Sequence, residues 1–143
     1  MKLIDPILQF QNELKLIRRS IHANPELSYE EFKTADLVAE KLTEWGIPII
    51  RGLGGTGVVG VISSGSSKRS VGLRADMDAL PLQELNQFAH KSVNPGKCTP
   101  ADMMVTRLCY SAQLITLQNI KILTVLFMLF FSRLKKERLV LSG

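Results

Sequence analysis

Hydrophobic side chains recur at helical spacing along the first part of the chain. Between Ile7 and Ile21 the apolar positions gather on one side of an α-helix, and charged positions occupy the other side. The charged positions are Lys15, Arg18 and Arg19. Asn24 precedes Pro25, and a residue before proline disfavours the helical conformation. The pattern therefore predicts an amphipathic helix that ends before Pro25.

A second helical pattern follows a short polar segment. Ser28 and Glu31 have the spacing of a capping box, in which two side chains bond to the free N–H groups of the first turn. Gly46 is a typical residue at the end of a helix. The side chains expected on the buried face are Phe32, Ala35, Leu37, Val38, Leu42 and Trp45.

Three short runs rich in Val and Ile predict β-strands over residues 47–50, 57–63 and 70–75. The glycines at 54–57 and the serines at 63–67 provide turns between these runs. No Lys-Ser or Lys-Thr pair and no helical pattern follows residues 54–57, so a turn is favoured over a phosphate-binding loop. Two helices followed by strands of a mixed sheet predict the beginning of an α/β domain.

The character of the sequence changes after Lys97. The formal net charge of the chain is +5, and residues 98–143 contain six Lys and Arg against two Asp and Glu. Both cysteines, Cys98 and Cys109, lie in this tail, and their spacing fits no standard zinc site. We therefore divide the chain into residues 1–97, the beginning of an α/β domain, and residues 98–143, an apolar and basic tail.

The tail raises two further possibilities, a membrane anchor and a nucleic-acid interface. Leu114–Phe131 is long enough to cross a bilayer, but it contains Lys121, which costs about 2.5–3.5 kcal/mol on insertion. This cost argues against a membrane span. A small protein anchored to a membrane by Leu114–Phe131 is the alternative interpretation of the chain. Nucleic-acid binding is not expected, because it would rest only on the net positive charge of the tail, without aromatic interleaving or a known motif. Two thiols and no signal-peptide pattern predict a reducing, cytoplasmic location.

Four motifs occur in order within residues 7–97. They are residues 18–27 (Arg-Arg-Ser-Ile-His-Ala-Asn-Pro-Glu-Leu), 54–60 (Gly-Gly-Thr-Gly-Val-Val-Gly), 72–81 (Gly-Leu-Arg-Ala-Asp-Met-Asp-Ala-Leu-Pro) and 95–97 (Pro-Gly-Lys). In this order and spacing they resemble the metal-dependent amidohydrolase family of hippurate hydrolases, N-acyl-amino-acid amidohydrolases and indole-acetyl-amino-acid hydrolases. The resemblance implies the amino-terminal fragment of a zinc-peptidase-like α/β catalytic domain.

The resemblance also implies a chemistry. Family members are homo-oligomers that hydrolyse N-acyl amino acids or similar amides with two divalent metals, which are zinc, manganese, nickel or cobalt. A metal lowers the pKa of a bound water, and a carboxylate takes its proton. By resemblance, Asp78 would orient this machinery and Asp76 lies nearby. A solvated acidic pair at a strand end is the alternative for these two residues. A lone histidine near a helix end, such as His22, is more often structural than a ligand.

The tail lacks the family's metal ligands. In the family, most ligands come from a His-Ala-Cys-Gly-His-Asp-Gly-His segment directly after Pro-Gly-Lys-Met, and from a later Gln-Pro-Ala-Glu-Glu segment. If the reading frame is moved one base upstream from Lys97 onward, the codons of Cys98 to Thr106 can spell the first segment. Those of Leu129 to Glu137 can spell the second. We therefore expect a frameshifted, truncated chain that binds no metal, is inactive, and retains Asp76 and Asp78 only as vestiges.

Overall fold

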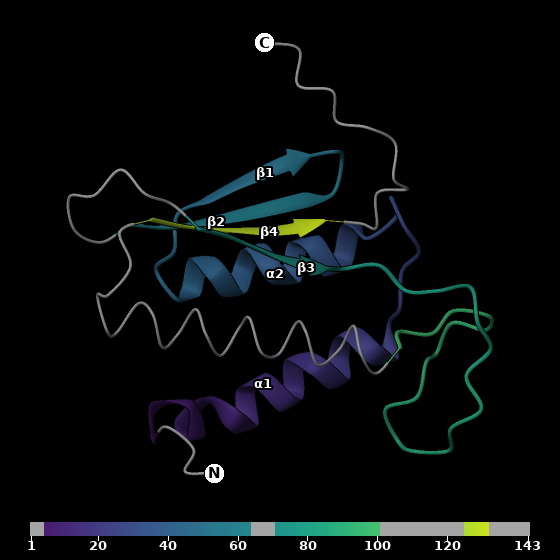
Figure 1. Cartoon of the computed structure of the whole chain (residues 1–143). Helices are drawn as coiled ribbons and strands as arrows, with labels where there is room; N and C mark the ends of the chain where they lie inside the picture. Colours follow the sequence, from purple (N-terminus) through teal and green to yellow (C-terminus); the bar gives the residue numbers. More distant parts are fainter. Residues whose placement is uncertain (1–4, 64–70, 101–124, 132–143) are drawn as a thin grey trace.

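The structure is a computed structural model that describes residues 5–63, 71–100 and 125–131. Two helices are followed by a mixed sheet, so the predicted α/β arrangement is confirmed (Figure 1). The elements are α1 (Asp5–Ala23), α2 (Phe32–Glu44), β1 (Ile49–Leu53), β2 (Gly57–Ser63), β3 (Val71–Asp76) and β4 (Val125–Phe131).

The sheet has the strand order β1-β2-β4-β3. Strand β2 runs antiparallel to both β1 and β4, whereas β3 runs parallel to β4. The carboxyl ends of β3 and β4 therefore point the same way, toward the loop that follows β3 (Figure 1). A central strand of the sheet is thus built from the tail.

Strand β4 is also the end of the segment that was considered as a membrane anchor. Val125–Phe131 pairs with β2 on one side and with β3 on the other. The earlier part of that candidate segment, residues 114–124, lies outside the described residues. Within the described ranges, no helix combines the length and apolar character that a membrane crossing requires.

The turn between β1 and β2 agrees with the glycine pattern. Gly54 and Gly55 have φ angles of +62° and +99°, values that residues with a Cβ rarely adopt. Strand β1 begins two residues later than predicted, at Ile49. Pro48 has no N–H to donate to a sheet, and Ile47 still bonds through its N–H to the carbonyl of Leu42.

The predicted capping box at the start of α2 is wrong. Glu31 occupies the N-cap position without any side-chain capping hydrogen bond. The cap comes instead from Glu26, whose Oε2 accepts hydrogen bonds from the N–H and the hydroxyl of Thr34, both at 2.8 Å. Its Oε1 accepts a bond from the N–H of Lys33 at 3.2 Å. A carboxylate beside free N–H groups at a helix N-terminus is favourable, and here the chain fold brings it there.

Glu31 has a buried role. It is 0% exposed, and its Oε2 accepts a hydrogen bond of 2.8 Å from the hydroxyl of Thr56. Thr56 lies directly before β2, so the bond fastens the start of α2 to the β1–β2 turn. The other carboxylate oxygen of Glu31, Oε1, has no hydrogen-bond partner within the described part of the chain.

The core lies between α2 and the sheet, and Figure 1 shows both helices on the same side of the sheet. A Cβ added to Gly60 would lie 3.2 Å from Ile47 and 3.4 Å from Leu42, so helix and strand meet closely at this glycine. Phe32 was predicted to be buried, but it is 63% exposed because the buried face of α2 begins only at Thr34. The buried cluster is Ala35, Ala39, Leu42, Ile47, Val58, Ala75 and Met77.

Candidate functional site

The loop after β3 returns to the end of α1 and is held there by backbone hydrogen bonds. The N–H of Ala79 donates to the carbonyl of Glu26 at 2.7 Å, and the N–H of Val93 donates to that of Ala23 at 2.9 Å. In Figure 1 this green loop lies beside the end of α1. Side chains from distant parts of the sequence therefore meet at this place.

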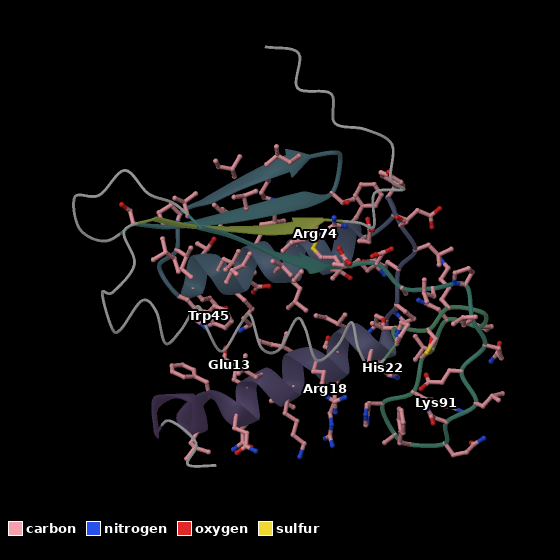
Figure 2. The ribbon with its side chains drawn as sticks, viewed as in Figure 1. Glu13, Arg18, His22, Trp45, Arg74 and Lys91 are labelled. Carbon is pink, nitrogen blue, oxygen red and sulfur yellow. The ribbon has the colours of Figure 1, made fainter. Side chains whose placement is uncertain are left out.

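His22 projects from the last turn of α1 into this region (Figure 2). Its Nε2 lies 2.8 Å from Oε1 of Glu84, and the two side chains are only 10% and 4% exposed. When Nε2 carries the proton, it donates to the carboxylate and leaves a lone pair on Nδ1. Nδ1 is buried and has no hydrogen-bond partner among the residues of the described ranges.

Glu84 is held by several donors. Its Oε1 also accepts a hydrogen bond of 2.9 Å from Nδ2 of Asn86, and its Oε2 accepts one of 2.6 Å from the N–H of Ser92. Burial opposes ionisation of this carboxyl, but the bonds from Ser92, Asn86 and His22 outweigh burial and lower its pKa to about 2. Glu84 is therefore a fixed carboxylate at neutral pH.

Two aromatic rings lie beside the imidazole of His22. The ring centroid of Phe88 is 5.5 Å from that of His22, and the centroid of His90 is 5.8 Å from it. Phe88 and His90 stack on each other with their centroids 4.2 Å apart. These contacts restrict the orientation of the buried histidine.

Cys98 completes a cluster with the pair. Its backbone exchanges two hydrogen bonds with Leu80, of 2.9 and 3.0 Å, which fixes the position of this half-buried residue. Metal-binding atoms of His22, Glu84 and Cys98 all lie within 4.8 Å of one another. Burial, and then the charge of Glu84, raise the pKa of the Cys98 thiol. Sequence patterns do not reveal this cluster, because Cys98 forms no zinc-site spacing with Cys109 and its two partners lie far away in the sequence.

The two predicted catalytic carboxylates lie at the end of β3 and outside this cluster. Asp76 is the last residue of the strand, and Oδ1 of its 33% exposed side chain accepts bonds from Nε and Nη2 of Arg74 at 2.9 and 2.8 Å. Asp78 is buried, with 2% of its surface exposed. The two residues thus have different environments, and their role stays a prediction.

The comparisons with known proteins agree on one family. No family model matches the chain. The chain is 46% identical over 121 residues to a hippurate hydrolase of Campylobacter jejuni, which is 83% of this chain and 32% of that protein. It is 49% identical over 81 residues to an IAA-amino acid hydrolase of Arabidopsis thaliana, which is 57% of this chain and 18% of that protein.

A solved structure of a metallopeptidase is also similar to this chain. A dinuclear metal-binding peptidase of the M20 family from Bacillus subtilis matches 85% of this chain with a TM-score of 0.79 and 26% identity. The match covers 35% of that protein. The chain therefore spans about a third or less of the length of the relatives that it matches.

The described residues do not fit a two-metal centre. They bring together one group of three potential ligands, His22, Glu84 and Cys98. A zinc ion in a protein usually takes four ligands, of which three or four come from the protein. The three residues of this group are therefore enough for one ion but not for two.

Proposed function

The chain is related, through an amino-terminal part, to the hydrolases of the M20 metallopeptidase and amidohydrolase family, and on this premise we propose its function. The parent protein is a metal-dependent amidohydrolase that cleaves the amide bond of N-acyl amino acids or similar amides. The observation that carries this proposal is the 46% identity to a hippurate hydrolase over 83% of the chain.

The substrate class follows from the names of two relatives. Hippurate and IAA-amino acids are both amides between a carboxylic acid and the amino group of an amino acid. A shared site for them must accept an acyl group on one side of the amide and an amino acid on the other. We expect the parent enzyme to work in the cytoplasm as a homo-oligomer, which cell fractionation and sedimentation would test.

Residues 1–97 supply the framework of the proposed catalytic domain. Buried Asp78, just after β3, would be a positioning residue near the carboxyl ends of β3 and β4. Asp76 would accompany it, held by Arg74. The ligand-bearing segments of the family would follow Lys97, where this chain lacks the His-Ala-Cys-Gly-His-Asp-Gly-His pattern. We therefore propose that the 143-residue chain is inactive.

We further propose that residues 98–143 arise from the parent gene read in a shifted frame. The support for this proposal is that both ligand-bearing segments of the family can be read from the tail in one constant shifted frame.

The nucleotide sequence after the Lys97 codon tests the frame. Adding one A there should open a frame that encodes Met-His-Ala-Cys-Gly-His-Asp-Gly-His and later Gln-Pro-Ala-Glu-Glu. Met103, Met104 and the start of Val105 leave no codon choice for the Asp-Gly pair. A Pro100 codon that ends in any base except T could not yield the cysteine, and would contradict the shifted frame. The tail would then be a selected sequence, and membrane fractionation would test the anchor alternative.

An activity assay tests the function. The repaired, full-length protein should hydrolyse hippurate or N-acetyl amino acids and should lose this activity to a chelator. The 143-residue chain, purified in parallel, should release no amino acid. Metal-dependent turnover by the short chain would contradict its proposed inactivity, and an inactive repaired protein across a panel of acyl amino acids would contradict the proposed reaction.

A further inference from the structure

We propose that His22, Glu84 and Cys98 of this chain bind a single zinc ion. The sequence alone predicts that the chain binds no metal, and the structural grouping of these three residues leads us to replace that expectation. The proposal concerns binding by the 143-residue chain itself, and it does not depend on the function proposed for the parent enzyme.

The geometry of the cluster is close to that of a zinc site. Zinc lies about 2.3 Å from a cysteine sulfur and about 2.0–2.2 Å from nitrogen or oxygen ligands, so tetrahedral donors are roughly 3.5 Å apart. The donor atoms of the three residues are already within 4.8 Å of one another. Movements of about 1 Å would bring them to ligand distances, and they leave a fourth position for water.

The donor set selects zinc over harder cations. An imidazole and a thiolate suit zinc, whereas magnesium and calcium prefer sites made entirely of oxygen atoms. The Glu84 carboxylate and a Cys98 thiolate together carry two negative charges, which balance a divalent ion. The buried imidazole of His22 adds a neutral donor without adding charge.

The surroundings hold the donors in place before a metal arrives. Ser92 and Asn86 donate hydrogen bonds to Glu84, and the backbone of Cys98 is paired with Leu80. Such outer contacts orient ligands and strengthen metal binding. Nδ1 of His22 is buried without a hydrogen-bond partner among the described residues, so the polar network around the pair is open at this atom.

A cysteine nucleophile activated by the His22–Glu84 pair is the rival interpretation. That role requires a thiolate at neutral pH, which neighbouring positive charge normally stabilises. Here burial and the negative charge of Glu84 raise the pKa of the Cys98 thiol, which disfavours the free thiolate. A bound cation would remove this obstacle, whereas a nucleophile would have to work against it.

Cobalt titration of the full 143-residue chain tests the proposal. Cobalt(II) should give the near-ultraviolet charge-transfer absorption of a cobalt–thiolate bond, and zinc should abolish it at one equivalent. Cys98→Ser should remove the absorption and lower zinc affinity by more than about 100-fold, since even outer-shell changes cost about 10–100-fold. His22→Gln and Glu84→Gln should each weaken zinc binding by at least about 10-fold.

The chain supplies a matched control. Cys109→Ser changes the other cysteine, and it should keep the absorption and the affinity. Zinc should also protect Cys98, but not Cys109, from alkylation of the unmutated chain, a measurement that avoids misfolded variants. Absent absorption, absorption that survives Cys98→Ser, or protection of Cys109 alone would overturn the proposal. None of these results depends on hydrolysis of hippurate.

Discussion

Nε2 of His22 lies 2.8 Å from Oε1 of Glu84, although 62 residues separate the two in sequence. The contact joins the last turn of α1 to the loop after β3, and both side chains are at least nine-tenths buried. Burial alone would make this pair costly, so its stability depends on the further donors that surround Glu84.

Replacing Glu84 by Gln should destabilise the metal-free chain by about 1–3 kcal/mol at pH 7. The change keeps the shape of the side chain but removes the charge that strengthens the bonds to His22, Asn86 and Ser92. Urea unfolding in the presence of a chelator would measure it. The exposed Glu44→Gln serves as control and should change the free energy of unfolding by less than about 0.5 kcal/mol.

The lowered pKa of Glu84 predicts that the stability of the folded chain depends on pH. The pKa of Glu84 is lowered from 4.5 to about 2 on folding, so ionised Glu84 favours the folded state. This contribution is complete above about pH 4.5 and is lost as the pH falls toward 2. The Gln variant should therefore lose less stability than the unmutated chain over this interval. Parallel pH curves for both proteins would contradict the assignment.

Replacing Glu26 by Ala should cost about 1–2 kcal/mol of stability, the upper range for loss of a helix cap. The change removes the acceptor of three hydrogen bonds at the start of α2, two of them from Thr34. Thermal or urea unfolding followed by circular dichroism would measure the loss. Glu40→Ala, an exposed change on the same helix, should have little effect. Equal effects of the two changes would refute the capping role of Glu26.

Replacing Thr56 by Val should destabilise the chain by about 1–3 kcal/mol. The valine keeps the volume of the side chain, but it leaves the fully buried carboxylate of Glu31 without its hydroxyl donor. Thr56→Ser retains the hydroxyl and should lose less than half as much. If the serine variant is the less stable of the two, packing of the methyl group, and not the hydrogen bond, holds this position.

Replacing Gly60 by Ala should destabilise the chain by about 1–3 kcal/mol, the usual effect of overpacking a core. The new methyl group would meet Ile47 at 3.2 Å and Leu42 at 3.4 Å, at the contact between α2 and β2. Unfolding measurements would detect the change. An unchanged or higher stability would show that helix and strand can separate slightly at little cost.

Local patterns in the sequence determined much of the framework. The apolar spacing and Pro25 predicted α1 and its end, and the run from Gly57 to Ser63 coincides with β2. The glycines before β2 predicted the turn. These features depend on neighbours within a few residues, because helix periodicity, strand alternation and backbone freedom are local properties. The family motifs likewise lie in continuous segments and are readable without a fold.

Tertiary structure decided which distant residues meet. The spacing of Ser28 and Glu31 predicted a capping box, but the fold brings Glu26 to the helix and buries Glu31 against Thr56. The position of β4 between β2 and β3 also depends on pairing across the chain.

The cluster of His22, Glu84 and Cys98 is the clearest case of such a meeting. Its three members are dispersed over 77 positions of the sequence, and the bonds that tie the loop after β3 to the end of α1 bring them together. A sequence pattern records the type and spacing of residues, whereas their distance in space depends on the path of the whole chain. The sequence therefore determined which donors exist, and the fold decided which of them can share one ion.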